Sequence, residues 1–168
     1  MSYVTINEYD RRVDDGAPSE WYAREGSSGF VRIDRSTSAD PPETEPDARA
    51  LVTWTGCCTR LFGERRRGAI AFLLKYPVPV EFLDEFDAWF YYEHMPILLE
   101  EKTWYGCEFY RALRPSMYTF AAIQHLEPEA MRSSVRERSR STPWWKRLEK
   151  HDWFDKGFVR AILKPLAT

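Results

Sequence analysis

The chain has 168 residues, which suits one domain with an added segment, and carries 24 Lys and Arg against 26 Asp and Glu. The resulting net charge of −2 argues against nucleic-acid and membrane-surface partners, because both select strongly basic proteins. Aromatic residues make up 15% of the chain, enough to fill a core and also to line a pocket.

The cysteines and the missing motifs narrow the function further. Cys57, Cys58 and Cys107 form no disulfide framework, because adjacent cysteines seldom pair and an odd count leaves one over. The sequence has no zinc-site spacing, no P-loop and no glycine-rich dinucleotide motif. It begins without a charged-then-apolar leader and has no apolar run long enough to span a bilayer. We therefore expect a cytoplasmic protein that uses neither a metal nor a cofactor.

Residues 1–67 are expected to form an N-terminal extension. The first fifty or so residues lack sustained periodicity, and residues 35–48 are acidic and rich in proline and serine, which predicts a mobile loop. Short apolar stretches at 29–33 and 50–54 flank this loop. They are compatible with an added edge strand, with an arm that drapes over the domain, or with disorder.

Residues 68–168 show a clear succession of elements. Apolar and β-branched runs predict strands, and apolar residues at helical spacing predict helices. Pro96 should kink or end the first helix near His94, and Pro143 should divide the second. The expected elements are a strand at 68–76, a helix at 80–101, strands at 103–113 and 117–126, a helical region at 127–154 and a strand at 157–163.

This βαββαβ order predicts an α+β, ferredoxin-like domain at 68–168, with a four-stranded antiparallel sheet and both helices on one face. The other face of such a sheet is apolar and bare. We expect a second copy of the chain to cover it, giving a homodimer with an α/β barrel across the twofold axis. The alternative is that the N-terminal arm covers that face instead.

The first predicted helix carries the most informative residues. Trp89 and Glu93 lie one turn apart, as do Phe90 and His94, and Pro96 should open this end of the helix toward a cavity. A histidine there can act as a general acid or base, because the pKa of an imidazole lies near the working pH. Glu93 could orient His94 or compete with it. The alternative is that His94 caps the kinked helix end by bonding a free carbonyl.

The string Trp89-Phe-Tyr-Tyr-Glu-His-Met-Pro96 resembles the W-x-x-x-E-H-x-P signature of EthD-like and related dimeric α/β-barrel proteins. The strand order that follows is also similar to theirs, and the resemblance covers residues 68–168. It implies that His94 lines a cavity between the helices and the sheet. Members of that superfamily include lactone isomerases, polyketide cyclases and cofactor-free oxygenases, so the resemblance does not select a reaction.

Tyrosine, cysteine and a second histidine are further candidates. Tyr92, Tyr105 and Tyr110 could donate hydrogen bonds to a carbonyl or an enolate, although tyrosines in strands more often serve packing. Cys107, expected on the same strand face as Tyr105, would need a basic neighbour to act as a nucleophile. His125 lies near a strand end, where a hydrogen bond to a loop is the simpler role.

Aromatic residues are the candidates for holding a substrate ring. Trp89 and Phe90 flank the histidine in sequence, and Trp144 and Trp145 belong to an unusual tryptophan-rich stretch. That stretch could form a wall or lid over an aromatic ligand, or it could pin the divided helix to the sheet.

These residues lead to three hypotheses for the function. The first is a cofactor-independent isomerase, cyclase or lyase for a small aromatic, lactone or polyketide-like substrate, with His94 moving the proton. The second is a cofactor-free monooxygenase of phenolic substrates. The third is a non-catalytic small-molecule binding protein that uses the same cavity.

Overall fold

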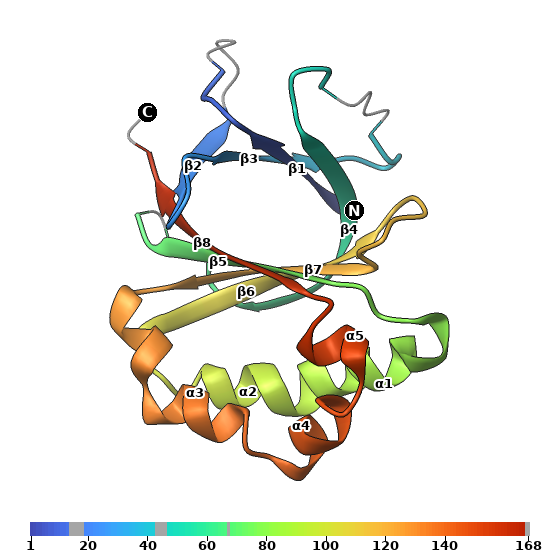
Figure 1. The fold of residues 1–168 in the computed structure, drawn as a ribbon, viewed down its shortest axis with the longest axis vertical. Coiled ribbons are helices and arrows are strands. Elements are labelled where there is room, and N and C mark those ends of the chain that lie inside the picture. The colour runs from blue at the N-terminus through green and yellow to red at the C-terminus, as the bar shows by residue number, and fades with distance from the viewer. Residues whose placement is uncertain (14–18, 43–46, 67, 167–168) are drawn as a thin grey trace.

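The computed structural model describes residues 1–13, 19–42, 47–66 and 68–166, and these form a closed antiparallel barrel with helices packed against one side (Figure 1). The order of strands around the barrel is β1-β3-β2-β8-β5-β7-β6-β4. The strands are β1 (Ser2–Tyr9), β2 (Glu20–Arg24), β3 (Phe30–Thr37), β4 (Val52–Gly63), β5 (Ile70–Tyr76), β6 (Trp104–Ala112), β7 (Phe120–Leu126) and β8 (Val159–Pro165).

Both predicted helical regions are confirmed. The first consists of η1 (Val80–Phe82), α1 (Leu83–Trp89), η2 (Phe90–His94) and α2 (Met95–Leu98). The second consists of η3 (Pro128–Arg132), α3 (Ser134–Ser139), α4 (Pro143–Leu148) and α5 (Asp152–Asp155). The predicted break at Pro143 is the start of α4, where the Thr142 hydroxyl accepts a hydrogen bond from the Trp145 N–H and caps the new helix.

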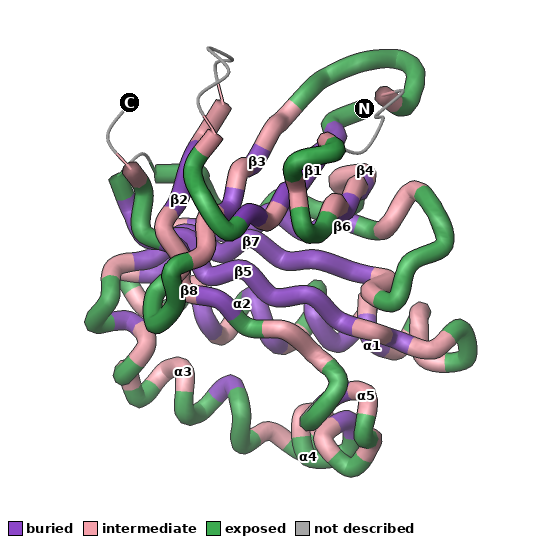
Figure 2. Tube along the Cα trace, turned by 45° about the horizontal axis from the view of Figure 1, so that its top comes forward, coloured by how far each residue is buried: buried purple, intermediate pink, exposed green. Residues whose placement is uncertain are grey.

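The four strands predicted between residues 68 and 168 are present as β5 to β8. β5 and β7 are buried along their whole length, as Figure 2 shows, because the helices cover one face of the sheet and the rest of the barrel covers the other. Burial on both faces explains why β5 reads as a continuous apolar run and not as an alternation.

The N-terminal residues complete the barrel, and this corrects the expected sheet. β4 pairs with β6, and β2 pairs with β8, so the sheet has eight strands among the described residues where four were predicted. The apolar face that a second copy was expected to cover is covered by β1–β4 of the same chain. The barrel across a twofold axis was therefore wrong, and a homodimer stays a prediction without that support.

The predicted mobile loop at 35–48 is in part ordered structure. Ser36 and Thr37 belong to β3, and the Asp47 carboxylate accepts hydrogen bonds from the Tyr9 hydroxyl and from Arg49, each at 3.0 Å. Residues 43–46, the centre of the predicted loop, lie outside the described residues.

Alternation along the shared strands separates two cores. In β7, Ala121 and Ile123 face the barrel interior, whereas Phe120 and Ala122 face the helices. The same alternation places Gln124 on the helix side and His125 on the barrel side. No helix in the described part of the chain has the length and apolar character needed to cross a membrane.

Candidate functional site

The helix that carries His94 widens at that residue. The N–H of Met95 donates to the carbonyl of Phe90, five residues back, so Phe90–His94 form a π-helical turn. Pro96 has no N–H to offer to the carbonyl of Tyr92, and a regular α-helical turn cannot be completed there. The helix therefore continues through Pro96 as α2 and is not ended by it, and such wide turns are frequent at functional sites.

The wide turn stacks His94 on Trp89. Their ring centroids lie 4.5 Å apart with the planes at 28°, and Trp145 of α4 approaches His94 at 5.6 Å. Residues five apart lie on different faces of an α-helix, so this stack depends on the π turn. Phe90, one turn before His94, instead stacks on Phe109 of β6 at 4.2 Å and lies behind the site.

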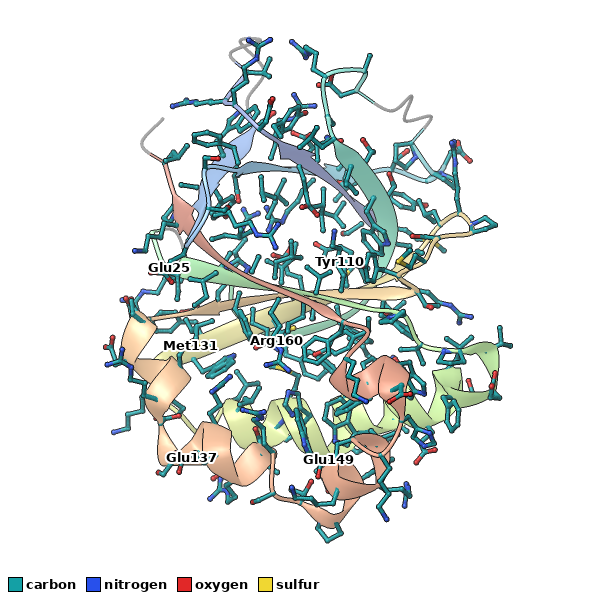
Figure 3. The ribbon with its side chains drawn as sticks, in the orientation of Figure 1. Glu25, Tyr110, Met131, Glu137, Glu149 and Arg160 are labelled. Atoms are coloured by element: carbon teal, nitrogen blue, oxygen red, sulfur yellow. The ribbon has the colours of Figure 1, made fainter. Side chains whose placement is uncertain are left out.

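A cavity of about 40 Å³ lies between the helices and the sheet, beside His94. It has room for a few water molecules but not for an aromatic ring. An open groove of about 470 Å³ adjoins it and shares the walls Phe72, Arg136 and Arg160. Figure 3 shows Arg160 and Met131, both lining this groove, between the sheet and the helices. A ring-sized substrate would therefore approach from the groove and displace side chains to reach His94.

Three residues that line the cavity carry buried polar atoms with no hydrogen-bond partner among the described residues. These atoms are Nδ1 of His94, Nε1 of Trp104 and both amide atoms of Gln124, a residue that is only 1% exposed. Each such atom costs about 1–3 kcal/mol when it is left unpaired. Buried polar atoms are otherwise nearly always paired, so a group of them around one cavity indicates a place for water or a ligand.

The charges around the cavity are positive. Arg136 and Arg140 line it together with His94, and Arg160 lies at its boundary with the groove. Burial, and after it the charges of Arg136 and Arg140, together lower the pKa of His94 to about 3, although a hydrogen bond to the main chain of Ser139 acts in the opposite direction. His94 is therefore neutral at neutral pH. Since Nδ1 has no partner, the bond to Ser139 involves Nε2, and Nδ1 keeps its lone pair.

The segment α3–α4 covers this cavity and is fastened to the first helical region. The Thr142 hydroxyl donates to Glu93 at 2.5 Å, and Trp144 Nε1 and Arg147 both bind Glu85. In the described structure Glu93 has no hydrogen bond to His94. Its observed contact holds the cover in place and does not orient the histidine.

The structure thus brings together only some of the predicted site residues. His94 and Trp145 line the cavity, and Trp89 stacks on His94 without lining it. Trp144 does not line the cavity and binds Glu85 instead. Tyr92 is 72% exposed on the outer face of the helix and does not line the cavity.

A β-bulge in β6 changes which residues face the helices. The pairing of β6 with β7 shifts between Trp104 and Gly106, so Trp104 joins Cys107 on the helix side, where Tyr105 was expected. Gly106 allows this close approach, because a Cβ there would lie 2.5 Å from the carbonyl oxygen of Phe62. The Tyr105 hydroxyl donates to Glu127 at 2.8 Å, away from the cavity.

Cys107, Tyr110 and His125 lie elsewhere. Burial, together with the charge of Glu108, raises the pKa of the Cys107 thiol well above its ordinary value, which disfavours the nucleophilic thiolate. Tyr110 and His125 both face the barrel interior, where each is hydrogen-bonded to Glu108. Among the described residues, no group of three or more His, Cys, Asp or Glu side chains could hold a metal ion.

Sequence reasoning missed Gln124, Trp104, Arg136 and Arg140. The signal for Gln124 was its position in β7, where it is an amide directly after the apolar residues Phe-Ala-Ala-Ile. Arg136 in α3 and Arg140 at its C-terminal cap are four residues apart and therefore lie on one side of the helix. This spacing was a weak signal, because a basic helix face is more often exposed to solvent.

Comparison with known proteins supports the fold alone. No protein-family model and no curated protein matches the chain. One similar solved structure is a ferredoxin-fold protein from Listeria monocytogenes related to antibiotic biosynthesis monooxygenases, with 12% identity and a TM-score of 0.66 over 100% of this chain and 96% of that one. A second is an anthrone oxidase-like protein, with 8% identity and a TM-score of 0.62 over 99% of this chain and 92% of that one. A third is a chlorite dismutase from Candidatus Nitrospira defluvii, with 11% identity and a TM-score of 0.59 over 98% of this chain and 91% of that one. They confirm the ferredoxin-like fold, whereas membership of the dimeric α/β-barrel superfamily and of an EthD-like family stays a prediction.

Proposed function

We propose that the helix-side cavity is a cofactor-free active site in which His94 removes a proton from a small phenol- or enol-type substrate. The observation that carries this proposal is a buried, neutral histidine with an unpartnered Nδ1 beside two arginines. A lone pair in a water-poor cavity can accept a proton, and cations beside it can stabilise the anion that is left.

Arg136 and Arg140 explain how a histidine with a low pKa in the free site could still act as a base toward a bound substrate. In the free site their charges oppose a proton on the imidazole. A substrate anion beside them would offset that repulsion and would also pair with the imidazolium, so the pKa of His94 would rise as the proton arrives. The basicity of His94 would then rise during the proton transfer, as negative charge develops on the bound substrate.

The substrate anion has two possible fates. In the first, an electron-rich carbanion at a CH₂ group reacts with molecular oxygen: one oxygen atom becomes a ketone on that carbon, and the other leaves as water with the two hydrogens. In the second, His94 returns the proton to another carbon, which isomerises or cyclises the substrate without oxygen. The monooxygenase-related and anthrone oxidase-like neighbours favour the oxygen-dependent route.

The experiment is turnover of an anthrone and of a small enol-lactone series, with and without oxygen, by the unaltered protein and by His94→Phe. Phenylalanine keeps a ring stacked on Trp89 but cannot accept a proton. We expect turnover to fall about a hundredfold or more, the usual effect of losing a general base, while the free energy of unfolding changes little. Tyr92→Phe is the matched control and should leave turnover unchanged, because Tyr92 is exposed.

The outcomes separate the hypotheses. Oxygen uptake that matches product formation supports the monooxygenase, and equal turnover without oxygen supports the isomerase or cyclase. Undiminished turnover in folded His94→Phe would contradict a role for His94 as base. Tight binding of every compound without turnover would favour a binding protein.

A further inference from the structure

A second pocket, of about 370 Å³, opens at one end of the barrel. Its polar walls are Glu20, Tyr22, Arg65, Arg66 and His125, which come from β2, the β4–β5 connection and β7. His125 faces away from the helix-side cavity, so none of these residues belongs to the site proposed for His94. The volume lies within the range of small-molecule sites, whereas the cavity at His94 does not.

A buried carboxylate lies directly behind this pocket. Glu108 is 7% exposed and accepts four hydrogen bonds: from His125 Nε2 at 2.8 Å, from Arg35 at 2.7 and 2.8 Å, and from the Tyr110 hydroxyl at 2.6 Å. Figure 3 shows Tyr110 within the barrel, on the far side of the sheet from the helices. Burial by itself raises the pKa of Glu108, but the bonds from His125 and Arg35 outweigh it and hold that pKa well below the usual range.

The ionised carboxylate fixes the state of His125. An ionised carboxylate can only accept hydrogen bonds, so Nε2 of His125 must carry a proton. In the neutral ring the other nitrogen, Nδ1, is then an acceptor, and it has no hydrogen-bond partner within the described residues. His125 is 2% exposed and yet lines the pocket, so the network holds a single basic nitrogen at the wall of a space large enough for a ligand.

The pocket also carries positive charge at its rim. Glu20 is bound by Arg35 at 2.8 Å, by Arg65 at 3.2 Å and by the Tyr22 hydroxyl at 2.9 Å, so its charge is already compensated. Arg66 adds a second rim cation and packs over the ring of Tyr105 at 4.4 Å. Three arginines against two carboxylates leave a net charge of +1 around the pocket, which attracts an anion.

We propose that the barrel-end pocket binds a small organic monoanion that also bears a hydroxyl group, such as a hydroxycarboxylic acid. The hydroxyl donates to Nδ1 of His125, and the carboxylate lies against Arg65 and Arg66. The apolar wall formed by Trp21, Pro165 and Leu166 takes the carbon skeleton. In this arrangement Glu108 and Arg35 position His125 and do not contact the ligand.

The test is binding of 3-hydroxybenzoate to the unaltered protein, followed by calorimetry and by the imidazole signals of His125 in ¹H–¹⁵N spectra. Two comparison ligands each remove one contact: 3-methoxybenzoate lacks the hydroxyl proton, and 3-hydroxybenzyl alcohol lacks the charge. We expect each to bind about tenfold or more weakly, and only ligands with the hydroxyl to shift Nδ1 of His125.

Variants then locate the site. His125→Gln keeps an amide donor for Glu108 but has no acceptor at the position of Nδ1, so it should weaken 3-hydroxybenzoate binding about tenfold. Arg65→Gln should weaken that binding severalfold and reduce its salt dependence. His94→Phe should leave this binding unchanged, which separates it from the proposed active site. Three outcomes would overturn the proposal: equal affinity for all three ligands, an unshifted His125 signal on saturation, or no binding of 3-hydroxybenzoate. The hydrogen bonds around Glu108 would then have a purely structural role in the barrel.

Discussion

Gln124 and His125 are neighbours in β7, but they belong to two regions of the molecule that treat polar groups in opposite ways. On the barrel side, His125, Arg35 and Tyr110 all converge on Glu108, and every lone pair of that carboxylate is used. On the helix side, Gln124 is equally buried and neither of its amide atoms has a partner in the described structure.

The contrast shows which buried polar groups stabilise the fold and which are available to a ligand. Groups paired across strands contribute stability and fix geometry, whereas unpaired groups cost stability and can still bond to another molecule where they line a cavity. Lys75 and Glu8, an ion pair in the barrel interior, follow the first pattern. His94 and Trp104 follow the second.

The largest expected effect is on the barrel side. Glu108→Leu would leave Arg35, His125 and Tyr110 buried without their acceptor, so the free energy of unfolding should fall by about 3–5 kcal/mol in urea denaturation. The exposed pair of Glu100 with Arg138 is the matched control, and Glu100→Ala should cost less than about 1 kcal/mol. A loss below about 1 kcal/mol for Glu108→Leu would show that pairing in the barrel contributes little.

A second prediction uses pH to separate the two regions. The pKa of His94 is about 3 in the folded protein against an ordinary value of 6.5, so between these values the unfolded chain binds the extra proton. The free energy of unfolding should therefore fall as pH drops from 6.5 toward 3, by up to about 1.4 kcal/mol per pH unit from this residue. His94→Phe should flatten that slope.

Glu108 also makes the free energy of unfolding fall as pH drops, but over a different pH range. Its pKa is lowered from 4.5, so its contribution is present above pH 4.5 and is lost only as pH falls below that value. Between pH 5 and 6.5 the Glu108→Leu variant should thus keep the slope of the unaltered protein. An unchanged slope in His94→Phe over that interval would mean that His94 is not held neutral by the fold.

The smallest effect should come from adjacent substitutions in β7. Gln124→Leu removes two unpaired buried atoms at similar volume and should raise the free energy of unfolding by about 1 kcal/mol, while turnover falls. His125→Leu, one residue on, should lower it because Glu108 loses a donor. The same sign of change at both positions, measured by thermal and urea unfolding, would remove the distinction between the two faces.

The sequence predicted the elements of residues 68–168 well, because long apolar runs and helical spacing dominate there. It failed at β1, where Thr5, Asn7 and Glu8 are polar residues within a largely buried strand and interrupt the alternation. The partners of Asn7 and Glu8 come from other strands, such as Thr53 and Lys75, and local patterns cannot show them.

The candidate site was predictable only at its helix. The motif around His94 identified His94, Trp89 and Pro96, which follows the π-helical turn. It did not identify the residues on other elements that face His94. Trp104 takes its place through a β-bulge, and Gln124 is significant because it lacks partners, a property that exists only in the folded chain. Arg35, at the start of the predicted mobile loop, is paired with Glu108 from the other half of the sequence.

Closure of the barrel within one chain has a consequence for how the protein folds. Its seams join distant parts of the sequence: Tyr22 lies opposite Pro165 where β2 meets β8, and Gly56 lies opposite Ala112 where β4 meets β6. Contacts between residues far apart in sequence slow folding, since a long loop must close before they form. During synthesis β1–β3 emerge before β8, so β2 has no partner on its β8 side until β8 has left the ribosome. The edge of β2 is thus exposed until β8 is synthesised, and a chain truncated before β8 would keep that edge open.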